Sequence, residues 1–189
     1  MKVTTLYIKN MVCDRCKTAV RQTLQNLGLN TKNVELGIAV IEGQLDEAKL
    51  NEIRKALGDI GFELLEDKHQ QTVDRIKSVI IELVHYRNNH STQTLSSCLS
   101  SELNADYSAL SKLFSENTGT TIERYFILQK IERIKELLSY GELTLSEIAA
   151  KMNYSSTAYL SSQFKSVTGM TPSQFKANHS KYRKQLDEI

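Results

Sequence analysis

The chain has few cysteines, no long apolar run and almost no excess of charge of one sign. Its 189 residues contain three cysteines, too few for a disulfide framework. No apolar run is long enough to span a membrane, and the N-terminus has no apolar stretch of the signal-peptide type. The sequence therefore predicts a cytoplasmic protein with one large or two small domains.

The net charge of +2 is too small to indicate a nucleic-acid partner by itself. Residues 1–74 hold 10 Lys and Arg against 11 Asp and Glu, whereas residues 75–189 hold 14 against 11. The positive net charge of the second half suits DNA, but this charge is too small to predict DNA binding. The sequence shows no nucleophile–base set and no nucleotide-binding loop, so it does not predict an enzyme.

Residues 144–175 have the pattern of two short helices joined by a tight turn. The first helix is predicted over residues 145–152, with a break at Asn153-Tyr154. Ser155 is the predicted N-cap of the second helix, because its hydroxyl can accept from a free backbone N–H. Gly169 is predicted to end that helix. This is the helix-turn-helix plan, in which the second helix enters the major groove.

The same plan occurs a second time upstream, at a constant spacing along the chain. A self-match at constant spacing marks a repeated structural unit. Residues 121–141 are predicted as a helix that joins the two units. The matching pairs are Leu110 and Leu160, Ser111 and Ser161, Phe114 and Phe164, Gly119 and Gly169, Thr121 and Thr171, and Tyr125 and Phe175.

Tandem units of this kind resemble the AraC/XylS family of DNA-binding domains. The resemblance covers residues 73–182 and rests on SALSKLFSENTG (108–119), IERIKELL (131–138) and the sequence 145–175 with its Gly-x-Thr-Pro-x-x-Phe ending. It implies an all-α domain, placed at residues 73–189, that binds double-stranded promoter or operator DNA and regulates transcription. RNA polymerase and a second copy of the chain stay open as further partners.

Helical spacing separates an apolar side from a polar side in both second helices. The resemblance implies that the polar side contacts DNA, and a solvated helix face is the alternative. Neither helix has an arginine, so bidentate readout of guanine is excluded, while lysines can contact phosphates. The predicted DNA-facing residues are Ser108, Ser111 and Lys112 in the first unit, and Ser156, Thr157, Ala158, Tyr159, Ser161, Ser162 and Lys165 in the second.

Residues 1–68 read as a separate α+β domain in the order βαββαβ, which predicts a ferredoxin-like sheet with helices on one face. The predicted strands are residues 2–10, 31–36, 38–43 and 62–67, and the predicted helices are residues 17–28 and 46–61. Residues 69–72 are the predicted linker. The helix that follows, residues 73–86, is expected to open the DNA-binding domain and to transmit a signal, with Tyr86 inward and His85 at the surface or at the helix end.

Cys13 and Cys16 lie where the first strand meets the first helix. With this order and spacing the domain resembles the heavy-metal-associated domain of copper chaperones and metal-transporting ATPases. The motif residues are Met11, Cys13 and Cys16, with Gly61-Phe62 in the loop that packs near the site in that family, and Asn10 stands where the family usually has glycine.

Two thiolates three residues apart at a helix start can converge on one ion, and the helix N-terminus lowers the pKa of a thiol there. Soft thiolates select Cu(I) or another soft metal ion, whereas a closed zinc site needs four ligands. Met11 is predicted to pack in the core. Two other interpretations stay open, a redox pair and a domain that serves only dimerisation.

The leading hypothesis is a one-component transcription regulator that responds to a soft metal ion bound at Cys13 and Cys16. A metal-buffering or trafficking module tethered to DNA is the second hypothesis. The third is a regulator whose first domain serves dimerisation or redox sensing.

Overall fold

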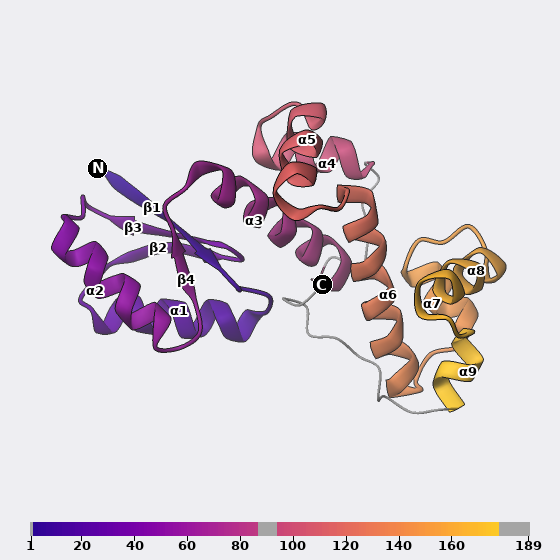
Figure 1. Cartoon of the computed structure of the whole chain (residues 1–189). Helices are drawn as coiled ribbons and strands as arrows, with labels where there is room; N and C mark the ends of the chain where they lie inside the picture. The colour runs from indigo at the N-terminus through magenta and orange to yellow at the C-terminus, as the bar shows by residue number, and fades with distance from the viewer. Residues whose placement is uncertain (1, 87–93, 178–189) are drawn as a thin grey trace.

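A computed structural model describes residues 2–86 and 94–177. Its first part is a four-stranded sheet with two helices, and the part that follows is helical (Figure 1). The order β1-α1-β2-β3-α2-β4 is the one that the sequence predicted, and the ferredoxin-like assignment stays a prediction. The elements are β1 (Val3–Lys9), α1 (Asp14–Asn26), β2 (Thr31–Glu35), β3 (Ile38–Glu42), α2 (Glu47–Gly58) and β4 (Glu63–Leu65).

The sheet has the strand order β2-β3-β1-β4, and all neighbouring strands are antiparallel. In β1 the residues Leu6 and Ile8 are buried, whereas Tyr7 and Lys9 between and after them are only half-buried. Such alternation follows from the two-residue period of a strand with one covered face. Figure 1 shows α1 and α2 on that covered face. Their buried residues are Val20 and Leu24 in α1, and Ile53 and Leu57 in α2.

The helical part consists of two helix pairs on either side of a long helix, α6 (Figure 1). One pair is α4 with α5, the other α7 with α8, and α6 contacts helices of both pairs. The helices are α3 (Lys68–Ile81), the π-helical turn η1 (Glu82–Tyr86), α4 (Leu95–Leu103), α5 (Tyr107–Thr118), α6 (Ile122–Tyr140), α7 (Leu145–Lys151), α8 (Thr157–Thr168) and α9 (Pro172–Ala177).

The helix predicted to begin at residue 73 begins earlier, at Lys68, so the predicted linker is helical. Residues 69–72 lie inside α3, because Asp67 caps that helix and accepts from the backbone N–H of His69 and Gln70, both at 2.9 Å. Aspartate is a favoured N-cap residue, and no glycine or proline follows Asp67, so the sequence contained a signal for this helix start. The predicted C-terminal domain also includes residues 87–93 and 178–189, which lie outside the described residues.

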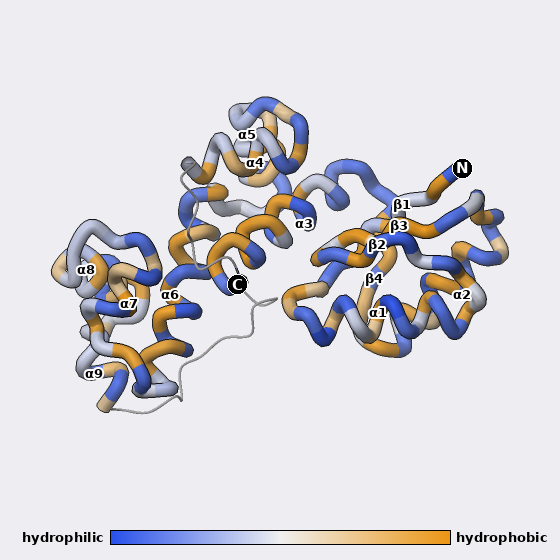
Figure 2. The backbone as a smooth tube through the Cα atoms, turned by 180° about the vertical axis from the view of Figure 1, so that it is seen from behind, coloured by the Kyte–Doolittle hydropathy of each residue, from blue (hydrophilic) through white to orange (hydrophobic). Residues whose placement is uncertain are grey.

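Helix α3 belongs to the cores of both parts. Val73, Ile76 and Ile80 pack in the helical core, whereas Ile81 packs in the core of the first domain. Figure 2 shows apolar stretches along α3 and along the strands that it approaches. No helix in the described residues has both the length and the apolarity needed to cross a membrane.

Candidate nucleic-acid interface and cysteine pair

The two helix-turn-helix units place their caps at matching positions but have different turns. Asp106 caps α5 and Ser156 caps α8, while Gly119 and Gly169 end these helices in the left-handed conformation. In both units an asparagine with positive φ begins the turn, and the next backbone N–H bonds back to the preceding helix. The first turn then runs Asn104-Ala105-Asp106, and the second runs Asn153-Tyr154-Ser155-Ser156, one residue longer.

The predicted N-cap of the last long helix is therefore wrong by one residue. Ser156, not Ser155, caps α8, and its hydroxyl accepts from the backbone N–H of Tyr159 at 3.1 Å. Both serines are good capping residues, so the sequence alone did not distinguish them. Ser156 thus has a structural role as well as a place on the exposed face.

In α5 the predicted polar side faces away from the core. Leu110 and Phe114 are buried, Ser108 and Lys112 are exposed, and Ser111 is half-buried. The Ser108 hydroxyl donates to the Asp106 carboxylate, and Lys112 pairs with Glu116 at 4.0 Å. Ala109, which is not among the predicted residues, is also exposed beside Ser108.

In α8 the buried residues are Leu160 and Phe164, and the predicted polar side is again open to solvent. Tyr159 is 55% exposed, and its ring centroid lies 5.8 Å from that of Tyr154 in the turn. The assignment of single residues to DNA stays a prediction. The exposed residues of the predicted set are Ser156, Ala158, Tyr159, Ser162 and Lys165, and the half-buried ones are Thr157 and Ser161.

The cysteine pair lies at the start of α1. Cys13 is the N-cap residue in an extended conformation, and Cys16 is in the first turn. Their sulfur atoms are 3.1 Å apart, and both residues are half-buried free cysteines. Asn10 takes φ 72°, the region where the family glycine would be expected and which asparagine tolerates. Its amide donates to the carbonyl of Gly61 at 3.4 Å, so the two predicted loops meet.

The surroundings of the two thiols determine which side chains could join them as metal ligands. Met11 is 2% exposed in the core, as expected, and so is not free to bind. Within the described residues no group of three or more His, Cys, Asp and Glu side chains gathers to hold a metal. Burial and the contact with Cys13 raise the pKa of the Cys16 thiol, and they outweigh the lowering by backbone hydrogen bonds at the helix start. A metal bound there must displace protons from thiols.

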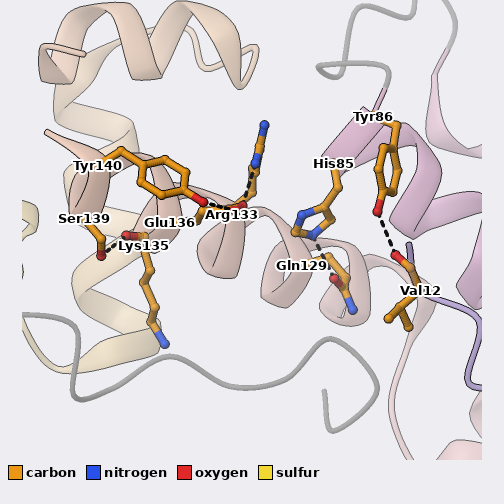
Figure 3. A network of polar contacts seen from close by, with 9 residues as sticks. All are labelled: Val12, His85, Tyr86, Gln129, Arg133, Lys135, Glu136, Ser139 and Tyr140. Carbon is orange, nitrogen blue, oxygen red and sulfur yellow. Dashed lines mark hydrogen bonds and ion pairs between the residues drawn. The ribbon is translucent and has the colours of Figure 1, made fainter. Parts of the chain in front are cut away.

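Hydrogen bonds connect the cysteine loop to the helical part through η1 (Figure 3). The Tyr86 hydroxyl donates to the carbonyl of Val12 at 3.0 Å. On the same turn, His85 Nε2 lies 3.1 Å from Gln129 Oε1 on α6. Tyr86 is 39% exposed, so its predicted inward position is wrong. His85 is half-buried in the last turn of η1, which agrees with a helix-end position. A π-helical turn shifts the phase of the side chains that follow it.

Two further contacts attach α3 to the hairpin between β2 and β3. The Arg75 guanidinium donates to the carbonyl of Leu36 at 2.9 Å. Ser78 packs on Gly37 so closely that a Cβ added there would lie 2.6 Å from its hydroxyl oxygen. The β2–β3 hairpin and the first helix-turn-helix unit are thus attached to one helix, α3.

A family model described as a helix-turn-helix domain matches residues 99–178. The xylose operon regulatory protein of Escherichia coli (strain K12) is 29% identical over 98 residues, 51% of this chain and 25% of that protein. An uncharacterised HTH-type transcriptional regulator of Staphylococcus aureus (strain MSSA476) is 31% identical over 115 residues, 61% of this chain and 14% of that protein. The chain thus spans a quarter or less of the length of these curated relatives.

A solved structure shares the fold of the helical part. The C-terminal domain of AraT, a response regulator from Geobacillus stearothermophilus, superposes with a TM-score of 0.50 at 24% identity, over 63% of this chain and 96% of that one. The family model supports a helix-turn-helix domain at residues 99–178, and the solved structure supports the fold of the helical part. The family model does not extend over the first domain, whose resemblance to heavy-metal-associated domains stays a prediction.

Proposed function

We propose that the chain is a sequence-specific DNA-binding regulator of transcription. The observation that carries the proposal is the pair of capped helices, α5 and α8, which both present an exposed polar side from one continuous helical domain. The second helix of such a unit is the one that enters the major groove. The family match and the named relatives, which are transcription regulators, support this activity rather than an enzymatic one.

The proposed interface has little charge, and this affects how it reads DNA. Lys112 and Lys165 are the exposed lysines of α5 and α8, and the remaining exposed side chains are mostly small and neutral. Lysines contribute affinity through phosphates, independent of sequence. Serine and threonine hydroxyls bond several base edges, so we expect modest discrimination spread over many positions rather than a few dominant base contacts.

Selection from a randomised duplex library tests this activity. The full chain should enrich a sequence motif, and its affinity for the selected duplex should exceed that for a scrambled one by at least about 10³-fold. Lys165→Glu should weaken both affinities, because it places a negative charge against phosphates. Lys55→Glu on α2 is the matched control and should change neither. Absence of enrichment in the wild type would end the proposal.

We further propose that Cys13 and Cys16 bind a soft metal ion, for which Cu(I) is the first candidate. Two half-buried sulfur atoms that already approach each other support this, because soft ions prefer thiolates and Cu(I) needs fewer ligands than zinc. The bound ion would supply one positive charge, which offsets one of the two thiolate charges. It would also order the loop that carries Val12, whose carbonyl accepts from Tyr86.

A metal changes DNA affinity only if it binds two arrangements of the protein with different affinity. The structure offers η1 as the connection, since Tyr86 bonds the cysteine loop and His85 contacts α6. A typical coupling free energy of about 1–3 kcal/mol corresponds to about a 5–150-fold change in DNA affinity. By reciprocity, the selected duplex should change Cu(I) affinity by the same factor.

Cu(I) titration against a competing chelator, with and without the selected duplex, tests the metal proposal. Wild type should bind one equivalent, and Cys13→Ser/Cys16→Ser should bind none while it still binds DNA. Tyr86→Phe is the sharper variant, because it keeps both thiols but removes the hydrogen bond to Val12, so it should bind Cu(I) with reduced coupling.

The alternatives predict different outcomes. Stoichiometric Cu(I) binding that leaves DNA affinity, oligomeric state and transcription unchanged would favour a metal buffer tethered to DNA. DNA affinity that responds to a thiol oxidant but not to Cu(I) would favour redox sensing.

A further inference from the structure

Several polar side chains of α6 are almost fully buried, and Lys130 differs from the others. Gln129 contacts His85, and Glu132 pairs with Lys135 at 2.6 Å. Lys130 is 7% exposed, and within the described part of the chain its ammonium group meets aromatic rings rather than a carboxylate. A buried lysine of this kind needs a physical reason, because burial of an unpaired charge is costly.

The ammonium nitrogen of Lys130 lies 3.8 Å from the ring centroid of Tyr154 and 5.6 Å from that of Phe126. A cation over an aromatic face is attracted by the ring quadrupole, most strongly where water is excluded. Tyr154, itself 9% exposed, lies in the turn between α7 and α8. The contact therefore attaches the second unit's turn to the long helix between the units.

Tyr154 in turn holds α8 at two places. Its hydroxyl donates to Gln163 Oε1 at 2.6 Å, in the middle of the helix. Its ring lies beside that of Tyr159, which is exposed on the side predicted to face DNA. A continuous line of contacts thus leads from Lys130 to the proposed DNA-reading surface.

Burial lowers the pKa of Lys130 to about 8, and no charged neighbour contributes to the shift. Burial also raises the pKa of Tyr154, which stays neutral while Lys130 titrates. The other charged groups on the elements packed around this site are Glu123, Arg124, Glu132, Arg133, Lys135 and Glu136 on α6, Glu147 and Lys151 on α7, Lys165 on α8 and Lys176 on α9.

We propose that Lys130 is a positioning residue for DNA recognition, whose ammonium holds Tyr154 and through it orients α8. This inference rests on the proposed function, in which α8 reads DNA. The charged form holds the ring, so the hold weakens as the pH rises through the Lys130 pKa. DNA affinity at the base pairs read by α8 should fall over the same range.

Folding stability should move in the opposite direction. The folded-state pKa of Lys130 lies below the unfolded value of 10.5, so the burial cost is largest at low pH. Stability from this residue therefore rises as the pH passes from about 8 toward 10.5, because the neutral amine is easier to bury. A residue with a merely structural role would make affinity and stability change together.

The test compares the pH dependence of affinity for the selected duplex in wild type, Lys130→Arg and Lys130→Met, from about pH 6.5 to 9. Arginine stays charged throughout, so Lys130→Arg should keep a constant affinity. Lys130→Met should be weaker by roughly 3–10-fold at every pH, the loss of one cation–π contact. The affinity of the wild type should match that of Lys130→Arg below about pH 8 and approach that of Lys130→Met above it. Lys55→Met removes a charge far from this site, and its affinity should follow that of the wild type.

A measurement on the free protein separates this inference from the proposed function. The NMR signal of the Lys130 Cε should titrate near pH 8, and the ring signals of Tyr154 and Tyr159 should shift with the same midpoint. Parallel affinity profiles in wild type and Lys130→Met, or ring signals that ignore the titration, would overturn the inference. Failure of the wild type to bind any duplex would instead refute the proposed function.

Discussion

The two helix-turn-helix units share a plan but are held in place differently. The first unit packs on α3, a helix that also enters the core of the sheet domain. The second unit packs on α6, and its turn places Tyr154 where the first turn has Ala105. Ala105 instead helps to line an open groove of about 480 Å³ between α3 and the sheet.

This difference indicates which unit can respond to the first domain. Any movement of the cysteine loop or of the β2–β3 hairpin reaches α3 and η1 directly, through Tyr86 and Arg75. The second unit is held by aromatic contacts of its own and lies one helix further away. We therefore expect regulation to act on α4 and α5 first, and on α7 and α8 only through α6.

The largest expected effect comes from removal of the buried ring of either unit. Phe164→Ala should destabilise the second unit by about 3–5 kcal/mol, since Phe164 is fully buried against Phe175. Phe114→Ala should do the same to the first unit, where Phe114 packs against Tyr125. Hydrogen exchange should show the loss of protection mainly in the mutated unit. A shift within about 0.5 kcal/mol would mean that the rings are not core residues.

The attachment of α3 to the hairpin can be broken at Gly37. Alanine there meets both a φ of 78° and the Ser78 hydroxyl, whereas alanine at Gly28 meets a φ of 75° and open space. Left-handed strain costs both variants about 1–2 kcal/mol, so the excess loss in Gly37→Ala reports the packing of α3.

Chemical denaturation of the two glycine variants measures this excess, and Ser78→Ala in the Gly37→Ala background should recover part of it. In Gly37→Ala, amide exchange should rise in α4 and α5 more than in α7 and α8. Equal losses in both glycine variants would show that the hairpin does not support α3.

Phosphate contacts and base contacts in the two units should respond differently to mutation. Lys112→Ala should weaken binding to all duplexes alike and reduce the salt dependence by about one phosphate contact. Thr157→Ala should leave the salt dependence unchanged and relax preference at one or two base pairs. Affinities for matched and mutated duplexes at several salt concentrations distinguish these effects, and unchanged values in both variants would contradict the assignment of both faces.

The smallest expected effect is on the pH dependence of stability and comes from the N-cap residues of α5 and α8. Hydrogen bonds from the Ser108 hydroxyl and the backbone N–H groups of Ser108 and Ala109 lower the pKa of Asp106. A depressed carboxyl pKa stabilises the fold above the unfolded pKa of about 3.9, and this contribution is lost as the pH falls through the lower folded value.

The serine cap of α8 has no such titration. Asp106→Ser should therefore remove acid sensitivity from the first unit, and Ser156→Asp should introduce it into the second. Thermal melts between about pH 2 and 6 should show this exchange, and identical pH profiles would refute it.

Much of the fold could be predicted from the sequence, because the caps and the spacing of apolar residues depend on residues close together in the chain. Asp46 caps the helix that the sequence predicted to start there, and Gly169 ends α8 as expected. The alternation of β1 and the helical spacing of Leu160 and Phe164 likewise determine which side of each element is buried. These features depend on the chain within a few residues, so the sequence alone contains them.

Other features could not be predicted, because they depend on residues that are distant in the chain but in contact in the fold. Two adjacent serines were equally suited to cap α8, and the longer turn around Tyr154 selected Ser156. A lysine in a helix is usually expected at the surface. The buried position of Lys130 is explained by its contact with the ring of Tyr154, which the sequence pattern does not show. The attachment of Tyr86 to Val12 joins residues 74 positions apart. The sequence by itself determined the elements, their ends and the repeat, because caps and periodicity act locally. The tertiary structure decided which helices are shared between domains and which charges are buried, because these are set by partners distant in the chain.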